Sequence, residues 1–397
     1  MNSRRNALFI RMGAYDITQA IPRAASTLQE MGYNITILSL DRYREKPDIE
    51  SINGWKIIWY HSSYKPGHKL SFLWMWIRWW VWVIRKICSG QYSLIQALNL
   101  ESVVPCVLAK PFRRFKLIFD VRDPWGMTNL NSRSFMMRTF KGMERWAAAR
   151  VDGIVLSQGI LDRTANYFGK KVCLRVPNVQ VLNVPGRDIA GQYCPPNLDG
   201  IRINFSGHIS YVRNAQAVID LASRMPQVKV DVVGEIRDKK LLAALQVLPN
   251  ITLYEQLPFA QAMDLLRQAN LICVMYDTNT ELAVVSSANK MFEAMMMSRP
   301  YVASEKGYPG IIAERYGLGW TVPYGNSQAL IELVSELLNY PAKIELAARK
   351  GREAFEKHFT WDKQKANLVL LYRGVSGEEQ MVFYSHAGWN KMIGTNF

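Results

Sequence analysis

The chain has 397 residues, 49% of them hydrophobic, and a formal net charge of +16. This length and apolar content predict two or three globular domains and exclude a disordered protein. Residues 1–200 hold 28 basic and 14 acidic residues and the remainder 21 and 19, so the first half carries nearly all of the excess charge. Such a field attracts phosphate, whether in nucleic acid, anionic lipid or a phosphorylated substrate.

The cysteines predict reduced thiols and a cytoplasmic setting, because they are dispersed and odd in number. No two have the CxxC spacing of a zinc site. They stand at Cys88, Cys106, Cys173, Cys194 and Cys273. The apolar run at residues 7–10 is too short for the hydrophobic core of a signal peptide and is better interpreted as a first strand.

The first half is predicted to begin with a βαβ unit. In this half, strands are expected over residues 6–10, 34–40, 117–119 and 153–157. One helix is expected to end near residue 31, and another is expected over residues 133–150. Prolines and glycines accumulate between residues 177 and 200, which indicates a linker there.

The second half alternates strands with helices of about ten residues. Strands are expected over residues 201–206, 228–233, 251–254, 271–276 and 300–303, and helices over residues 215–225, 237–247, 259–269, 291–297 and 328–338. This alternation predicts a parallel sheet covered on both faces, with ligands at the carboxyl ends of the strands. We therefore expect an α/β protein with two Rossmann-like, doubly wound domains facing a cleft.

The segment over residues 284–300 carries the strongest chemical signal. Ser287 and Asn289 lead into a helix, whose free N–H groups and dipole attract anions. Lys290 adds a positive charge, and Glu293 lies one turn further on the same face, where it could accept from a sugar hydroxyl. The alternative is an ordinary capped helix with a Lys290–Glu293 surface pair.

A second signal lies at residues 204–214, NFSGHISYVRN. Gly207 ends a predicted strand and permits close approach of the backbone to a ligand. His208 follows, and Arg213 could bind a diphosphate with its planar fork. The alternative is a tight turn with a solvated Arg.

Taken together and in this order, these segments resemble the retaining glycosyltransferases of family 4 (glycosyl transferases group 1), which have the two-domain GT-B architecture. A strand-end Gly-Arg-Leu-x-x-x-Lys segment holds the donor diphosphate in that family. Its counterpart here is Gly207-His208-Ile209, with Arg213 at the Lys position. Asn289-Lys290-x-x-Glu293 resembles a branch of the family with Asn-Lys-x-x-Glu, which implies that Glu293 contacts the nucleotide ribose.

The resemblance extends over residues 5–375 and is weaker in the first half, where it includes Gly13. The donor site that it implies comprises Gly13, Gly207, His208, Arg213, Ser287, Asn289, Lys290 and Glu293. Two positions depart from the family. His208 replaces an Arg, and Val285 stands where a Glu normally touches the donor sugar; Asp277 and Glu281 on the same loop are candidate substitutes.

Glycosyl transfer requires stabilisation of the leaving diphosphate, which fixed cations and N–H dipoles supply. Arg213, Lys290 and the helix amides fit this role without a metal, and no Asp-x-Asp motif is present. No cofactor is expected beyond the nucleotide-sugar donor substrate. In the first half, Asp123 and Arg122 follow a predicted strand and are the candidate catalytic residues; the alternative is a turn in which Arg122 pairs with Asp120 or Asp123.

Residues 70–87 hold five of the twelve tryptophans. Because Arg78 lies in the middle of this short stretch, an amphipathic helix in the lipid headgroups is favoured over a spanning helix. Phe72, Trp76, Trp79, Trp80 and Val83 recur at spacings of three or four and are expected to share the lipid-facing side. A buried helix with Trp as core residues is the alternative. The expected docking residues are Trp74, Trp76, Trp79, Trp80, Trp82, Arg85 and Lys86.

The sequence therefore predicts a peripheral glycosyltransferase at the cytoplasmic face of an anionic membrane, with a lipid-linked or saccharide acceptor and no nucleic-acid partner. The alternatives are a nucleotide-sugar epimerase of the same fold and an inactive glycosyltransferase-like partner. The expected domains are an acceptor and membrane-docking domain over residues 1–178, a linker over 179–200, a donor domain over 201–375, and a tail over 376–397 that could return to the first domain.

Overall fold

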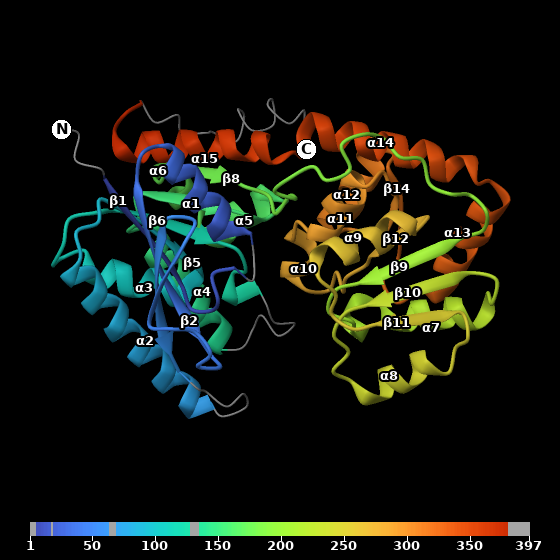
Figure 1. Cartoon of the computed structure of the whole chain (residues 1–397), viewed down its shortest axis with the longest axis horizontal. Helices are drawn as coiled ribbons and strands as arrows, with labels where there is room; N and C mark the ends of the chain where they lie inside the picture. Colours follow the sequence, from blue (N-terminus) through green and yellow to red (C-terminus); the bar gives the residue numbers. More distant parts are fainter. Residues whose placement is uncertain (1–4, 17–18, 63–68, 128–134, 380–397) are drawn as a thin grey trace. The chain divides into compact units, whose positions relative to one another are not determined.

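The computed structural model describes residues 5–16, 19–62, 69–127 and 135–379, and it divides the chain into two units (Figure 1). The first unit holds the chain up to Val181 and again from Gln364 onward, and the second unit holds Leu182–Lys363. Each unit is built on one largely parallel sheet with helices between the strands, as the alternating pattern of the sequence predicts.

The first unit contains an eight-stranded sheet in the order β3-β4-β2-β1-β5-β6-β7-β8. All neighbouring strands are parallel except β3 and β4. The strands are β1 (Asn6–Arg11), β2 (Asn34–Asp41), β3 (Ile49–Ile52), β4 (Trp55–His61), β5 (Leu94–Leu98), β6 (Lys116–Val121), β7 (Gly153–Leu156) and β8 (Asn178–Gln180). The helices are α1 (Ala20–Glu30), α2 (Lys69–Ser89), α3 (Asn99–Ala109), α4 (Phe135–Ala148), α5 (Leu161–Phe168) and α6 (Lys170–Arg175), with a 3₁₀ turn, η1 (Trp125–Met127). Helix α15 (Trp361–Ser376) belongs to this unit from Gln364 onward.

The second unit contains a six-stranded parallel sheet in the order β11-β10-β9-β12-β13-β14. Its strands are β9 (Arg202–Ser206), β10 (Lys229–Val233), β11 (Ile251–Tyr254), β12 (Leu271–Val274), β13 (Tyr301–Ser304) and β14 (Gly319–Val322). Its helices are α7 (Ala215–Arg224), α8 (Lys239–Gln246), α9 (Phe259–Gln268), α10 (Glu281–Val285), α11 (Asn289–Met296), α12 (Tyr308–Tyr316), α13 (Ser327–Asn339) and α14 (Ala342–His358), with a 3₁₀ turn, η2 (Tyr211–Arg213).

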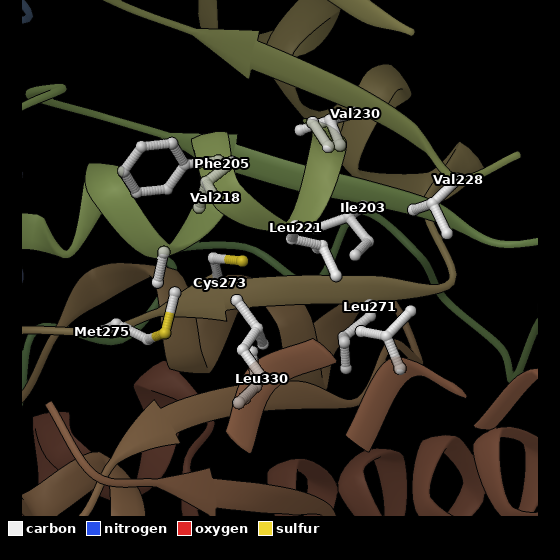
Figure 2. Packing of buried hydrophobic residues seen from close by; sticks show 14 of the residues in the cluster. Ile203, Phe205, Val218, Leu221, Val228, Val230, Leu271, Cys273, Met275 and Leu330 are labelled. Atoms are coloured by element: carbon white, nitrogen blue, oxygen red, sulfur yellow. The ribbon is translucent and has the colours of Figure 1, made fainter. Parts of the chain in front are cut away.

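Apolar side chains of strands and helices form the core of the second unit (Figure 2). Ile203 and Phe205 on β9 alternate with residues that face the other side of the sheet, and Val218 and Leu221 of α7 pack against them. Leu330 of α13 joins the same cluster. This packing fixes the carboxyl end of β9, from which the candidate donor site is built.

The boundary of the units differs from the predicted limits at both crossings. Residues 182–200 belong to the second unit because buried arginines hold them there: Arg352 Nη1 lies 2.9 Å from Asp188 Oδ1, and Arg299 Nη1 donates to the Cys194 carbonyl at 2.7 Å. Helix α15 returns to the first unit before residue 376, because the Tyr372 hydroxyl donates to buried Gln96 Oε1 on β5.

Candidate functional site

The candidate donor site lies where the order of strands in the second sheet reverses, between β9 and β12. Ligands of open parallel sheets bind at this position. Gly207 follows β9 with a φ of 115°, and Gly234 follows β10 with a φ of 134°. A Cβ atom on Gly234 would lie 2.0 Å from the Gly207 carbonyl oxygen, so these two strand ends can approach each other only with glycine at position 234.

Arg213 at the end of η2 lies beside Gly207 and over the ring of Tyr276. Its guanidinium carbon is 4.3 Å from the ring centroid, and Nη1 donates to the Tyr276 hydroxyl at 2.9 Å. A Cβ atom on Gly207 would lie 3.9 Å from the same Nη1. Tyr276 itself follows β12, and its backbone N–H donates to Ser304 Oγ at the end of β13. The planar cation is therefore held at the carboxyl ends of three adjacent strands.

Helix α11 supplies the second cation. Its N-cap residue, Ala288, has no side-chain oxygen that could accept from the first N–H groups of the helix. Lys290 Nζ lies 2.7 Å from Glu293 Oε2 on the next turn, and both side chains are partly buried. Burial raises the pKa of Tyr276, Arg213 opposes this rise and Glu293 adds to it, which places Tyr276 in the field of both charged groups.

The structure thus brings together Gly207, Arg213, Lys290 and Glu293. Asn289 is exposed at the start of α11, whereas Ser287, two residues earlier, is buried. His208 is exposed beside Gly207. The pKa of the nearby Glu235 carboxyl is lowered, chiefly by its hydrogen bond and ion pair with Arg237.

The two departures from the family pattern lie in different surroundings. Val285 is fully buried in α10, so this side chain is part of the core and presents no polar group to a ligand. Asp277 accepts from the backbone and side-chain N–H groups of Asn279, at 3.0 and 2.8 Å, and so holds its own loop. Glu281 is exposed in the first turn of α10.

The candidate acceptor site lies at the carboxyl edge of the first sheet. Arg11 ends β1, Asn99 follows β5, and Arg122 and Asp123 follow β6. Gly13, which the resemblance assigns to donor binding, lies in the turn after β1, where its carbonyl accepts from Ser39 Oγ at 2.8 Å. β1 and β5 are neighbours at the reversal of strand order in this sheet, so these residues also occupy a ligand-binding position.

Arg122 forms an ion pair with Asp120, as the alternative interpretation of this cluster proposed. Its Nε lies 2.6 Å from Asp120 Oδ1, and the Asp120 carboxylate is fully buried. Gln96 Nε2 donates to Asp120 Oδ2 at 2.7 Å, and Tyr372 donates to Gln96 Oε1 at 2.5 Å. Arg122 is thus fixed by a buried network that reaches helix α15.

Asp123 takes no part in this ion pair. Within the described part of the chain, its carboxylate has no hydrogen-bond partner, and the residue is exposed at the protein surface. Desolvation by the surrounding protein raises the pKa of Asp123, against the opposing fields of Arg122 and Arg11. An exposed carboxylate with a raised pKa beside two cations is suited to accept a hydrogen bond or a proton from an acceptor hydroxyl.

Sequence reasoning missed several residues of these sites. Tyr276 carries no local motif and becomes a site residue only because β12 lies beside β9. Asn99 has a left-handed backbone, with a φ of 59°, and accepts from the N–H groups of Arg122 and Asp123. An Asn that ends a strand run was the available signal for it.

The prediction of which side of α2 faces lipid is wrong. The side chains of Trp76, Trp79 and Val83 are at most 5% exposed and pack inside the first unit. Trp80 is half-buried, and its indole N–H donates to the Glu101 carbonyl at 3.1 Å. Trp82 stacks on Trp79, with 5.3 Å between ring centroids. The side with most of the tryptophans therefore belongs to the protein core, because these rings fill the space between α2 and its neighbours.

The opposite side of α2 is exposed. Trp74 is 62% exposed, Ile77 41% and Val81 43%, and Arg78 and Arg85 lie among them. These positions recur at spacings of three and four and share one side of the helix. No acidic residue occurs in α2. We call these five residues the exposed face of α2.

None of the helices described is long and apolar enough to cross a membrane. No group of three or more His, Cys, Asp or Glu side chains that could hold a metal ion occurs among the residues that the structure describes.

Residues 202–340 match the family model described as Glycosyl transferases group 1. No curated protein sequence matches the chain. This match covers the strand-end segment, η2 and α11, and so contains every residue of the candidate donor site in the second unit.

Solved structures share the fold at low sequence identity. Sucrose-phosphate synthase from Thermosynechococcus elongatus aligns with a TM-score of 0.77 at 14% identity, over 95% of this chain and 100% of that chain. HepE from Anabaena, solved with UDP-glucose, gives 0.66 at 14% identity, over 92% and 98%. WaaG, a glycosyltransferase involved in lipopolysaccharide biosynthesis, gives 0.65 at 13% identity, over 92% and 99%.

A protein from Listeria monocytogenes, described as a UDP-N-acetylglucosamine 2-epimerase, also shares the fold. It aligns with a TM-score of 0.62 at 13% identity, over 96% of this chain and 98% of that chain. Residues 202–340 thus match the group 1 glycosyltransferases, and the chain as a whole has the GT-B fold of these structures, as the resemblance drawn from the sequence implies.

Proposed function

We propose that this chain is a metal-independent, retaining glycosyltransferase that moves a sugar from a nucleotide diphosphate to a lipid-linked acceptor at the surface of an anionic membrane. It needs no cofactor besides its donor substrate. The product is a component of a cell-surface polysaccharide or glycolipid. We place the protein at the cytoplasmic face of the membrane. The substrates are proposed to bind at the carboxyl edges of the two sheets.

The observation that carries this proposal is the placement of Arg213, beside the strand end at Gly207, and of the Lys290–Glu293 pair about Tyr276. We place two cations and the first N–H groups of α11, whose N-cap Ala288 has no side-chain acceptor, at the strand reversal, where a diphosphate gains both charge and hydrogen bonds. Negative charge develops on this diphosphate as the glycosidic bond breaks, so the same groups stabilise the transition state. Glu293 is the proposed acceptor for the ribose hydroxyls.

Asp123 is the proposed polar group on the acceptor side. Asp123→Asn is expected to leave the fold intact, because the carboxylate has no described hydrogen-bond partner. It is expected to lower turnover at least about tenfold, since a general base contributes about a hundredfold or more. Sugar transfer by the purified variant at saturating donor is the measurement, with circular dichroism as the check on folding. Transfer at the wild-type rate would remove Asp123 from the reaction.

The exposed face of α2 is the proposed membrane contact. Trp74, Ile77 and Val81 present apolar surface, and Arg78 and Arg85 complement anionic headgroups. Two further apolar side chains at the start of α4, Phe135 and Met136, are 87% and 55% exposed. They lie near α2, because Trp76 packs on Phe140 of α4 with 6.2 Å between ring centroids. The proposed surface therefore extends from α2 to the start of α4.

Binding to vesicles of phosphatidylcholine and phosphatidylglycerol tests this surface. We expect binding that weakens when the salt concentration rises from about 0.01 M to about 1 M, because the Debye length falls from about 30 Å to about 3 Å. Replacing Trp74, Ile77 and Val81 together with Ala is expected to reduce partitioning more than tenfold, since a buried side chain of this size contributes about 1.5–3 kcal/mol.

The matched control is Phe112→Ala, which removes an apolar side chain that is 72% exposed elsewhere in the first unit. A second pair separates charge from apolar contact: Arg78→Glu with Arg85→Glu is expected to abolish the salt dependence, whereas Lys239→Glu with Lys240→Glu in the second unit makes the same change in net charge and is expected to have no effect. No binding, salt-independent binding or equal loss in the controls would contradict the proposed surface.

A nucleotide-sugar epimerase is the second candidate, because a protein described as such an enzyme shares the fold. The two reactions differ in their products. Titration calorimetry with a panel of nucleotide sugars identifies the donor, and incubation of that donor with and without membrane extract then separates the functions. A free nucleoside diphosphate forms in the transferase reaction, whereas an epimerase returns an altered nucleotide sugar without any acceptor.

A further inference from the structure

The backbone of Asp123 is held from both sides of the loop that follows β6. Because its carboxylate has no described hydrogen-bond partner, the direction of this side chain depends on how firmly the loop is fixed. The loop crosses from β6 to the 3₁₀ turn η1, and each end has its own set of hydrogen bonds.

The first set holds the loop before Asp123. Asn99 Oδ1 accepts from the N–H of Arg122 at 2.9 Å and from the N–H of Asp123 at 3.2 Å. Gln158 Nε2 donates to the Arg122 carbonyl at 2.8 Å, and Ser157 Oγ donates to the same carbonyl at 3.1 Å. These contacts come from the ends of β5 and β7, on either side of β6.

The second set holds the loop after Asp123 and consists of two buried carboxyl groups around Trp125. Glu101 on α3 accepts the indole N–H of Trp125 at 2.9 Å. Glu144 on α4 accepts the backbone N–H groups of Trp125 and Gly126, at 2.8 and 3.4 Å. Glu101 is 7% exposed and Glu144 only 1%. A Glu in the core is uncommon, so two of them bound to one tryptophan require an explanation.

Packing fixes the same tryptophan from other directions. Trp125 lies edge-on against Trp76 of α2, with 5.5 Å between centroids, and 5.4 Å from Phe140 of α4. Tyr167 of α5 donates to Glu144, and its hydroxyl oxygen lies 2.3 Å from where a Cβ atom on Gly126 would be. The turn after Asp123 therefore has no room to move toward α5.

Burial is the main influence on the pKa values of both carboxyl groups. Burial raises the pKa of Glu101 to about 7, opposed by the Trp125 hydrogen bond and by Arg11, with Glu144 adding to the rise. Burial also raises the pKa of Glu144 to about 7, opposed by Tyr167 and the N–H groups of Trp125 and Gly126. Such buried acids are costly for folding alone, which is consistent with a positioning role.

We propose that Trp125, clamped by Glu101 and Glu144 and braced against Trp76 of α2, is a positioning residue that sets the direction of Asp123 toward the acceptor. This rests on the proposed function, because it requires that Asp123 serves the transfer. Trp125 acts through the backbone of the loop and not by contact with the reacting atoms. A displacement of about 1 Å at a reacting group costs up to about a hundredfold in rate, so a clamp of this kind has a measurable effect.

Trp125→Phe tests the proposal, because it keeps an aromatic ring against Trp76 and Phe140 but removes the indole N–H that Glu101 accepts. We expect a decrease in kcat of about ten- to a hundredfold, with the KM for the donor within about twofold of the wild type. Glu144→Gln is expected to act in the same direction, since an amide has one acceptor oxygen for the two backbone N–H groups. Trp146→Phe is the control, because Trp146 on α4 packs under Arg150 and has no described contact with this loop.

Hydrogen exchange provides a measurement that needs no substrate. In Trp125→Phe, the N–H groups of Asp123, position 125 and Gly126 are expected to exchange at least about tenfold faster than in the wild type, while β6 is unchanged. Wild-type kcat in Trp125→Phe, or wild-type exchange at Asp123, overturns the proposal. If radiolabelled UDP-glucose and the rest of the donor panel give no transfer with the wild type, the proposed function fails and the exchange of Asp123 alone decides whether Trp125 positions it.

Discussion

Replacement of Lys290 with Ala is expected to lower turnover by about a hundred- to a thousandfold, the effect of removing one fixed donor from a developing negative charge. The loss should exceed that of an ordinary surface lysine, because Lys290 is paired with Glu293, and both side chains are partly buried. Without its partner, the carboxylate of Glu293 would repel the diphosphate that Lys290 attracts. Steady-state kinetics with the donor identified by calorimetry is the measurement.

Arg213→Lys is the companion variant. It keeps the positive charge but loses the planar fork that stacks on Tyr276, so the expected loss is smaller than that of Arg213→Ala. Arg224→Ala is the matched control, because Arg224 on α7 is exposed and bonds only to Gln328 among the described contacts. Turnover of Lys290→Ala within twofold of the wild type would mean that the donor diphosphate lies elsewhere.

The second large effect concerns stability and pH. The pKa values of Glu101 and Glu144 are raised to about 7 in the folded state from about 4.5 in a free side chain. Between these two pH values the unfolded chain binds fewer protons than the native chain, so the free energy of unfolding falls as the pH rises through this window. One carboxyl with this shift contributes a loss of about 3 kcal/mol, complete near pH 8.

Glu101→Gln tests this dependence. The amide oxygen can still accept the Trp125 indole N–H, but the side chain no longer titrates. We expect its thermal midpoint relative to that of the wild type to rise steadily between pH 5 and 8. Glu353→Gln, at an exposed position of α14, is the control and should give a constant difference. A constant difference for Glu101→Gln as well would show that this carboxyl has an ordinary pKa in the folded protein.

The regular elements could be predicted because their patterns are local. The strands before Gly207 and Gly234 are short apolar runs that end at glycine, and the helices of the second half show one apolar side. Helix α12 was missed because Pro309 and Gly310 interrupt its pattern, although Pro309 lies at the helix start, where a missing N–H costs nothing. Strand β5 and helix α3 form one apolar run that periodicity does not divide.

The candidate donor site was largely predictable, and the acceptor side less so. Gly207, Arg213, Lys290 and Glu293 come from two segments whose order and spacing match a family. Glu101 and Glu144 have no motif and act together only through the folding of α3 and α4 around Trp125. The prediction of which side of α2 faces lipid was wrong for a different reason. Almost every position of this helix is apolar or aromatic, so the spacing of residues does not tell which side is buried.

Transfer of radiolabel from a nucleotide sugar to organic-soluble lipid tests the central claim most directly. The purified chain is incubated with membrane extract and each labelled donor of a panel that includes UDP-glucose. We expect label in the lipid phase with one donor, release of an equal amount of nucleoside diphosphate, and loss of both with Lys290→Ala. Absence of transfer with every donor, or conversion of a donor to its epimer without an acceptor, would contradict the proposed function.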